Sequence, residues 1–315
     1  MSITVLSPGA LTTVQDLGRW GHQRFGVPTS GAMDPRALRT ANILVGNDEG
    51  EACLECTLLG PTLRFERGSV IALTGGDLGA MIDDTPLAPY RAVAVEAGQK
   101  LHFTAVRTGC RAYLAVQGGL DLPLTLGSRS TYLRAALGGF EGRALRAGDV
   151  LPIKASKITL NNLALRHIDE HFIPREEYTL RVLLGPQDDY FSSAGLETFL
   201  SALYTVAPAS DRMGCRLSGP PIAHKTTGDI ISDGIALGAI QVPADGEPII
   251  MLADRQSVGG YTKIATVISP DLRILAQLKP GDRLRFAAVS IYEAQEALRA
   301  ERAALNTLKA VLAQF

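Results

Sequence analysis

The sequence predicts a mainly β protein with a few peripheral helices, and two patterns carry this prediction. Between residues 58 and 153, and again from residue 180, short apolar and β-branched runs alternate with Gly, Asp, Gln and Ser turn signals. The turn signals recur about every 10 to 20 residues, which favours a sandwich or barrel over alternating strand–helix units. A chain of 315 residues with 46% hydrophobic and 20% charged residues is also long enough for roughly two domains with buried cores.

A break in the strand pattern predicts the division of the chain. Between Ala155 and Tyr178 the residues are of mixed polarity and show no sustained period. The sequence therefore predicts, in chain order, an N-terminal β lobe over 1–155, a junction over 156–178, a C-terminal β lobe over 179–289 and a C-terminal helix over 290–315.

Helices are predicted from their end signals and from apolar spacing. The first begins with Asp34 as N-cap and Pro35 at the first helical position, and it ends at Gly46. A second, amphipathic helix is expected to place on one face Leu196, Phe199, Leu200 and Leu203. The last begins with a capping box of Ser290 and Glu293, and its apolar positions, expected to dock on the core or on a partner, are Ile291, Ala294, Leu298, Leu305, Leu308 and Leu312.

The charge balance argues against nucleic acid and membrane surfaces as partners. Lys and Arg number 31 against 32 Asp and Glu, so the formal net charge is −1 and no basic footprint exists. No apolar run reaches the roughly 18 residues of a membrane-spanning helix, and the first residues lack the basic region and apolar core of a signal peptide. We expect a cytoplasmic protein.

Metal and redox sites are not predicted. Cys53 and Cys56 form a CxxC, but their context EACLECTLLG is typical of a strand, so two small buried apolar residues are the favoured interpretation. His167 and His171 have the spacing of one helical face, yet a catalytic zinc site needs a third ligand and the HExxH form is absent.

The stretch from Gly238 to Lys263 combines polar clusters with a buried strand. The apolar run Ile249 to Leu252 is flanked by Gln241 on one side and by Asp254, Arg255 and Gln256 on the other, and the pair Gly259–Gly260 follows. This layout predicts strand, turn, buried strand and then a loop tight enough to approach a small ligand. The alternative is a hairpin whose polar residues cap their own turns.

Three further segments present polar residues in loop settings. The glycine-rich loop over 11–34, which contains Ser30 and Asp34, leads into a helix N-terminus, where backbone N–H groups favour an anion. The alternative is a packed loop without a ligand. Arg129 and Ser130 follow a glycine in GSRSTYLR, which is an anion-facing loop or a solvated turn. Asp211 and Arg212 lie in the Pro-, Ser- and Gly-rich segment APASDRMGCRLSGPP.

Several cofactor motifs are absent from the sequence. It contains no GxxxxGK[ST], GxGxxG, GxSxG or EF-hand spacing, and no methionine–lysine pair of the kind that accepts biotin. If the reaction needs ATP or carried biotin, another polypeptide supplies it.

Taken together, the polar segments resemble a known family. TTVQDLGRWGHQRFGVPTSGAMD, GSRSTYLRAALGGFEGRALRAGD, SDRMGCRL and GAIQVPADGEPIIMLADRQSVGGYTK strongly resemble the C subunit of 5-oxoprolinase, a family also called allophanate hydrolase subunit 2 or the biotin-dependent carboxyltransferase family. The resemblance runs in order from about residue 10 to residue 286 and leaves out the C-terminal helix. The family's usual text is DRQTTGGY followed by proline, whereas this chain has Ser257, Val258 and Thr262.

The resemblance implies a fold, a reaction and partners. The fold would consist of two cyclophilin-like β-barrel lobes. The reaction would be ATP-dependent hydrolysis of 5-oxo-L-proline to L-glutamate. It would need two partner polypeptides, which are the related B subunit of 5-oxoprolinase and its third subunit, A. These partners would bind or share the ATP. This chain would carry no covalent biotin. Two alternatives remain open. One is a carboxyltransferase subunit that moves a carboxyl group from carboxybiotin to urea or a similar amide. The other is a non-catalytic regulatory subunit that binds a kinase-inhibitor-like partner.

Residue roles follow from the chemistry of a cyclic amide, which needs fixed donors for developing negative charge and a group that handles a proton. We assign catalytic roles to Asp254 and Lys263. The expected substrate-binding residues are Arg255, Gln256, Tyr261, Gln241, Asp211, Arg212, Arg129, Ser130, Ser30 and Asp34. For each charged residue the alternative is an internal salt bridge.

Overall fold

The computed structural model describes residues 2–156 and 158–314, and the prediction of a mainly β protein is confirmed. The chain forms two compact units. Apart from the undescribed positions, the first comprises Met1–Trp20, Ser30–Pro174 and Ala303–Phe315, and the second comprises Gly21–Thr29 and Arg175–Arg302. Most of the predicted junction therefore belongs to the first unit, as do the last turns of the C-terminal helix.

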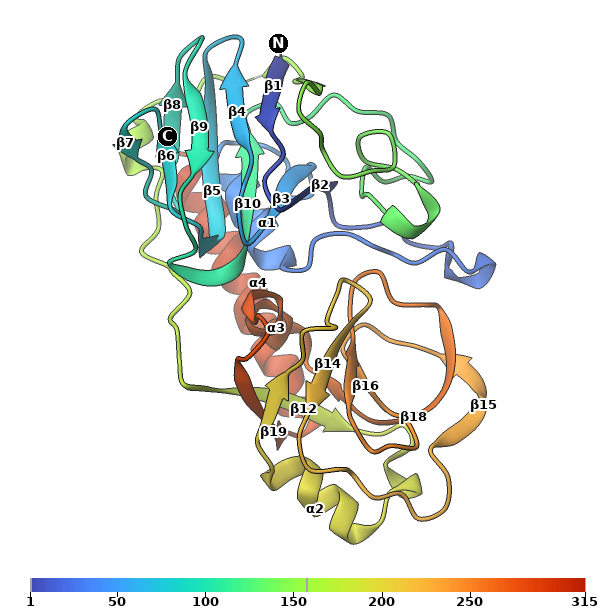
Figure 1. Cartoon of the computed structure of the whole chain (residues 1–315). Coiled ribbons are helices and arrows are strands. Elements are labelled where there is room, and N and C mark those ends of the chain that lie inside the picture. The colour runs from blue at the N-terminus through green and yellow to red at the C-terminus, as the bar shows by residue number, and fades with distance from the viewer. Residues whose placement is uncertain (1, 157, 315) are drawn as a thin grey trace. The chain divides into compact units, whose positions relative to one another are not determined.

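The first unit is built from one sheet packed on another (Figure 1). One sheet has the order β11 (Val150–Pro152), β1 (Ser2–Ser7), β4 (Thr62–Phe65), β9 (Lys100–Phe103), β6 (Ala80–Ile82) and β7 (Thr85–Pro86). The other has the order β2 (Leu11–Gln15), β3 (Cys53–Thr57), β10 (Thr108–Val116), β5 (Ser69–Asp77) and β8 (Ala92–Val95). Buried side chains from both sheets, among them Ile3 and Leu114, form one apolar core. Period-2 alternation in these strands points their apolar residues into that core.

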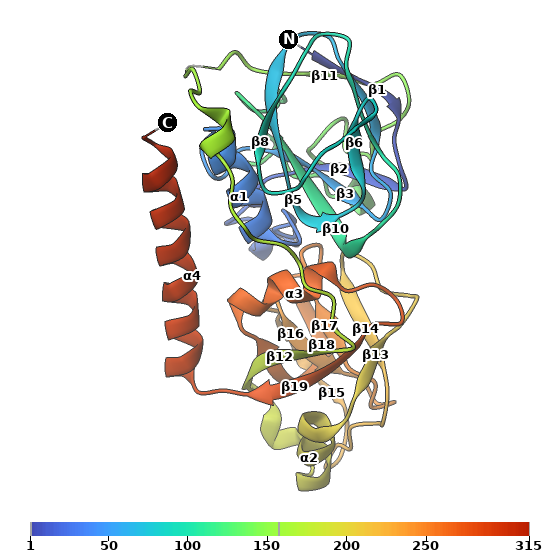
Figure 2. The same cartoon turned by 90° about the vertical axis from the view of Figure 1, so that its left-hand side faces the viewer.

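Helix α1 (Pro35–Leu44) covers the outer face of the second sheet in this unit. Asp34 accepts a hydrogen bond from the backbone N–H of Ala37, so the predicted N-cap is confirmed. The C-terminal turns of α4 (Ile291–Leu312) lie beside α1 (Figure 2). Their Leu305 and Leu312 join the apolar cluster of α1.

The segment before the second unit crosses these helices in extended form with one 3-10 turn, η3 (Leu163–Leu165). Buried Arg166 donates hydrogen bonds to the carbonyl oxygens of Ile43 and Leu44 at the end of α1 and of Leu312 at the end of α4. Carbonyls in the last turn of a helix lack the usual intrahelical partners, although that of Ile43 also accepts from the N–H of Gly46. One guanidinium thus caps both helix ends. Among the described residues no group of three or more potential metal ligands exists, at His167 and His171 or elsewhere.

The second unit contains a closed barrel. Its sheet has the order β12 (Glu177–Leu184), β19 (Arg283–Ala288), β13 (Tyr204–Val206), β14 (Gly214–Ser218), β17 (Ile249–Met251), β16 (Ala239–Val242), β18 (Val258–Val267) and β15 (Asp229–Gly234). A further antiparallel pairing joins Val182 of β12 to Val267 of β18 and closes the ring. Strand β15 stays outside the ring and pairs only with the first half of β18.

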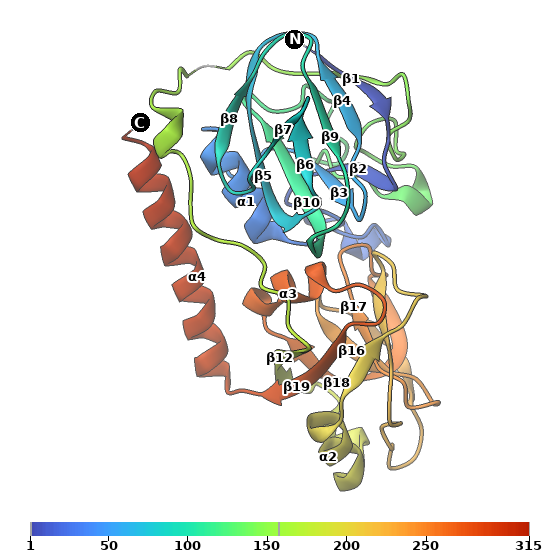
Figure 3. The same cartoon turned by 60° about the vertical axis from the view of Figure 1, so that its left-hand side comes forward.

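Short helices complete the second unit. Helix α2 (Ser193–Ser201) lies beside β19 (Figure 3). The ring of Phe199 stacks on that of Phe286 with centroids 4.5 Å apart. Leu203 lies beyond the end of this helix. Helix α3 (Leu272–Gln277) follows the 3-10 turn η5 (Ser269–Asp271). This unit also contains the 3-10 turns η1 (Gln23–Phe25) and η4 (Asp188–Tyr190), whereas η2 (Leu133–Ala135) belongs to the first unit.

The C-terminal helix is confirmed, but its apolar face was partly wrong. The Oε2 atom of Glu293 accepts from the N–H of Ser290, and the Ser290 hydroxyl accepts from the N–H of Glu293, as a capping box requires. Ile291 and Leu298, however, are 50% and 46% exposed, so in the first half of α4 only Ala294 of the predicted face is buried.

Cys53 and Cys56 lie on β3 and are buried, as predicted. Burial raises the pKa of Cys56 to about 12 and that of Cys53 further, so both stay neutral thiols at physiological pH. In the described part of the chain, no helix is both long and apolar enough to cross a membrane.

Candidate functional site

The stretch that the sequence singled out forms one wall of the barrel in the second unit. Gln241 lies on β16, Asp254 and Arg255 follow β17, and Lys263 lies on β18. The expected order of strand, turn and buried strand is present. The glycine pair departs from expectation, because Gly259 and Gly260 lie inside β18 and not in a loop. Strand β15 pairs with β18 at this point, and Asp233 stands opposite Gly259.

Asp254 forms a buried ion pair with Arg212. The Nε and Nη2 atoms of Arg212 lie 2.9 and 3.2 Å from the two carboxylate oxygens, and both side chains are more than nine-tenths buried. The backbone N–H of Asp254 also donates to the carbonyl of Arg212. A bidentate pair of this kind fixes both side chains. Asp211, by contrast, is exposed and caps its own turn by accepting from the N–H groups of Met213 and Gly214.

Arg255 is a buried cation without a carboxylate partner among the described residues. Its Nε donates to the carbonyl of Ile235 at 3.0 Å and its Nη1 to the carbonyl of Leu252 at 3.2 Å. Only 5% of the residue is exposed, and burial lowers the pKa of Arg255 to about 10, so the guanidinium is still protonated at neutral pH. A buried charge with no counter-charge costs several kcal/mol, which makes this arginine an expected anion-binding group.

Two neutral side chains near Arg255 have buried polar atoms that bond to nothing in the protein. These are the Nε2 of Gln241 and the hydroxyl oxygen of Ser257. Leaving a buried donor unpaired costs about 1–3 kcal/mol, and native proteins contain few such groups. A Cβ placed on Gly259 would lie 2.9 Å from the Gln241 Nε2 and 2.6 Å from the Cδ1 of Ile235. Gly259 therefore lets β18 approach Gln241 and Ile235 more closely than any residue with a side chain could.

Lys263 is buried, and its Nζ lies 3.3 Å from the Oδ2 of Asp233 on β15. The N–H of Gly234 and the ammonium of Lys263 lower the pKa of Asp233. Sequence reasoning missed Asp233, because an exposed acid in a polar strand carries no local signal. Gln256 and Tyr261, predicted for the same site, are exposed.

In the first unit, Arg129 and Ser130 contact an anion of the chain itself. The carboxylate of Asp16 accepts from the hydroxyls of Ser128 and Ser130 and from the backbone N–H of Arg129. The Arg129 side chain donates to the carbonyl of Leu122 and pairs with Glu51. The segment is buried at Ser128 and Ser130, so it is not a solvated turn.

The loop before α1 joins a second buried network in this unit. Glu55 accepts hydrogen bonds from the N–H of Met33 and from the hydroxyl of Tyr113, which in turn accepts from the N–H of Asp34. Burial and the neighbouring carboxylates raise the pKa of Tyr113 well above its ordinary value. Ser30 has a left-handed φ of 52°, and its buried hydroxyl has no partner. Glu55, a lone acid in an apolar strand, is the signal that sequence reasoning passed over.

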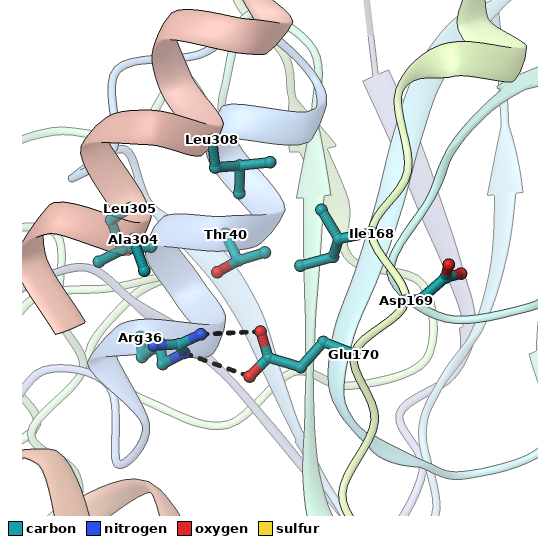
Figure 4. A pocket seen from close by; sticks show the side chains of 8 residues that line it. All are labelled: Arg36, Thr40, Ile168, Asp169, Glu170, Ala304, Leu305 and Leu308. Carbon is teal, nitrogen blue, oxygen red and sulfur yellow. Dashed lines mark hydrogen bonds and ion pairs between the residues drawn. The ribbon is translucent and has the colours of Figure 1, made fainter. Parts of the chain in front are cut away.

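The first unit also contains a pocket of about 210 Å³ beside α1 and α4 (Figure 4). The guanidinium of Arg36 and the carboxylate of Glu170 face each other at its edge, with nitrogen–oxygen distances of 2.8 and 3.2 Å. The other lining residues are Thr40, Ile168, Asp169, Ala304, Leu305 and Leu308. None of the predicted site residues lines this pocket.

Comparison with known proteins decides the family. The family described as "Carboxyltransferase domain, subdomain A and B" matches residues 25–288. The chain belongs to this carboxyltransferase family. The resemblance inferred from the polar segments is therefore confirmed.

Individual family members cover the chain almost completely. The chain is 38% identical to the C subunit of 5-oxoprolinase from Haemophilus influenzae over 310 residues, which is 98% of each protein. It is also 38% identical to the same subunit from Escherichia coli over 295 residues, or 94% of each. The crystal structure of Kluyveromyces lactis urea carboxylase matches with a TM-score of 0.90 and 33% identity, over 98% of this chain but only 29% of that one.

Proposed function

We propose that this chain is the C subunit of a 5-oxoprolinase, an ATP-dependent complex that hydrolyses 5-oxo-L-proline to L-glutamate. The observation that carries the proposal is the match in length: the chain and its Haemophilus influenzae relative each cover 98% of the other. The B and A subunits would complete the enzyme and bind or share the ATP, since the sequence has no phosphate-binding glycine loop of its own.

The second unit would supply the groups that act on the substrate. The ammonium of Lys263 would stabilise negative charge that develops on the lactam oxygen, because a buried cation interacts strongly with an oxyanion. Asp254 would act by holding Arg212 in place through their bidentate pair. Arg255 and Gln241 would bind the substrate, and the exposed Gln256 and Tyr261 would contact it from the solvent side.

Most of the remaining predicted residues would position other groups and would not contact the substrate. The polar groups of Asp211, Arg129, Ser130 and Asp34 are hydrogen-bonded within their own units, which supports positioning roles. Ser30 keeps a free buried hydroxyl and stays a candidate for substrate contact.

A carboxyltransferase activity on urea or a similar amide is the second candidate. The 0.90 TM-score to urea carboxylase favours it. The carboxybiotin would then come from another polypeptide, because this sequence has no biotinylation signal.

Reconstitution with the purified B and A subunits tests the proposal. We expect glutamate from 5-oxoproline and ATP when all three polypeptides are present, and none when this chain is left out. Glutamate formation that does not depend on this chain would contradict the proposal. Carboxylation of urea by the chain with a carboxybiotin donor, without glutamate formation, would favour the second candidate.

A further inference from the structure

We propose that the second unit contains, within this one chain, a binding site for a small carboxylate. We call it the Gly259 cradle and define it by Arg255, Gln241, Ser257 and Gly259. The identity of its ligand, the carboxylate of 5-oxoproline, rests on the proposed function. The existence of an anion site rests on the contacts of the chain alone.

The first step concerns the charge of Arg255. The nearest acid in sequence, Asp254, is held by Arg212 through two hydrogen bonds. The acid on the neighbouring strand, Asp233, is directed to the Nζ of Lys263 and to the N–H of Gly234. No ion pair involves Arg255 in the described part of the chain, and its Nη2 makes no hydrogen bond there. The guanidinium thus has a donor left for an anion that the chain does not provide.

The second step concerns the neutral donors. The Nε2 of Gln241 can only donate, and it is buried with no acceptor. The hydroxyl of Ser257 is buried and also has no partner. Because native proteins pair nearly all their buried polar groups, two unpaired ones beside an uncompensated cation indicate a missing ligand with acceptor oxygens.

The third step places these groups together. Ile235 connects them: its carbonyl accepts from the Nε of Arg255, and its N–H donates to the carbonyl of Ser257. Its side chain and the amide of Gln241 both border the space where a Gly259 side chain would stand. Arg255 and Ser257 are therefore linked to the backbone of Ile235, and Gln241 lies beside its side chain, next to β18.

The ligand class follows from this arrangement. One cation and neutral donors suit a singly charged carboxylate better than a phosphate, which binds to clusters of several cations or backbone N–H groups. 5-Oxoproline carries one carboxylate on a five-membered ring, whereas urea carries none.

Glycines 259 and 260 provide a matched pair of variants. Neither has a positive φ, so alanine is compatible with the backbone at both positions. At Gly259 the new Cβ would displace Gln241 and Ile235. At Gly260 its nearest neighbours would be the Ile230 carbonyl at 3.4 Å and the Ser232 hydroxyl at 3.7 Å, which are ordinary contacts.

The test is binding of 5-oxoproline to the isolated full-length chain, measured by calorimetry. We expect wild type and Gly260→Ala to bind equally, and Gly259→Ala and Arg255→Lys to bind at least about tenfold more weakly. The first weak variant displaces the Gln241 donor, and the second replaces the planar guanidinium fork with a single ammonium group. 2-Pyrrolidinone, the same ring without the carboxylate, is expected not to bind. Circular dichroism confirms that each variant is folded, and Arg255→Lys keeps the test valid if Gly259→Ala unfolds.

Three results would overturn the inference: no binding by wild type, equal binding of 2-pyrrolidinone, or equal affinities of the folded Gly259→Ala and Arg255→Lys variants and wild type. These results are distinct from failure of the proposed function. A chain that binds no 5-oxoproline alone and yet supports glutamate formation in the complex refutes the cradle and leaves the function standing.

Discussion

The buried ammonium of Lys263 and the exposed carboxylate of Asp233 form an ion pair across two strands, with Nζ and Oδ2 3.3 Å apart. The Lys263 side chain is 3% exposed and that of Asp233 57%. Asp233 belongs to β15, the strand outside the closed barrel, so the orientation of a proposed catalytic lysine depends on a peripheral strand.

Asp233→Asn is expected to lower the kcat of the reconstituted complex by about tenfold, because a mispositioned catalytic group is costly to the rate. Asp229→Asn on the same strand is the control, since its carboxylate contacts no cation among the described residues. The pKa of Asp233 is lowered in the folded protein, so the ion pair persists above the ordinary carboxyl range of about pH 4 and is lost only as the pH falls through the lowered value. The kcat ratio of Asp233→Asn to wild type should therefore be constant between pH 6 and 8. Equal kcat values for Asp233→Asn and Asp229→Asn would refute the positioning role of Asp233.

Gln241→Glu is expected to place an internal anion in the Gly259 cradle. The substituted side chain has nearly the same shape, and its charge would pair with Arg255. We expect the melting temperature to rise by roughly 2–4 °C for each kcal/mol gained, and 5-oxoproline binding to disappear. If Gln241 served only in packing, the buried carboxylate would lower the melting temperature instead.

Arg212→Ala is expected to destabilise the second unit by about 3–5 kcal/mol, because it leaves the Asp254 carboxylate buried and unpaired. The double variant Arg212→Ala, Asp254→Asn should recover part of this loss. The exposed pair of Arg285 and Glu177 provides the control, for which Arg285→Ala should cost less than about 1 kcal/mol. Denaturation followed by fluorescence measures all three, and equal losses at positions 212 and 285 would show that the buried pair has no special role.

Arg166→Ala is expected to loosen the ends of α1 and α4. Removing a guanidinium that caps three carbonyls should cost about 3 kcal/mol locally. Faster amide hydrogen exchange in the last turns of both helices would report this loss. The exposed Arg146 supplies a control variant in the same unit, and unchanged exchange in Arg166→Ala would contradict the capping role.

Local signals predicted the elements whose ends are chemically marked. Asp34 with Pro35, and Ser290 with Glu293, fix helix starts through contacts three residues apart, which the sequence displays directly. The strand-rich class followed from turn spacing in the same way.

Long-range partners could not be predicted from the sequence. Ser130 donates to Asp16, which lies 114 residues away, and no local pattern connects them. Gly259 was expected in a loop because glycine pairs commonly mark turns, but pairing with β15 draws it into a strand. The predicted cluster around residues 254 to 263 was found because its polar residues are close in sequence. Asp233 became visible only through its ion pair with Lys263, and Ser257 only through its unpaired buried hydroxyl.

Glutamate release from 5-oxoproline by the reconstituted complex, with ATP and purified partner subunits, tests the central claim most directly. We predict that the wild-type chain supports the reaction, and that Arg255→Ala and Lys263→Ala, both still folded, each reduce kcat/KM by at least about a hundredfold, or 2.7 kcal/mol of transition-state stabilisation. Full activity in both variants, or no glutamate from the wild-type complex, would contradict it.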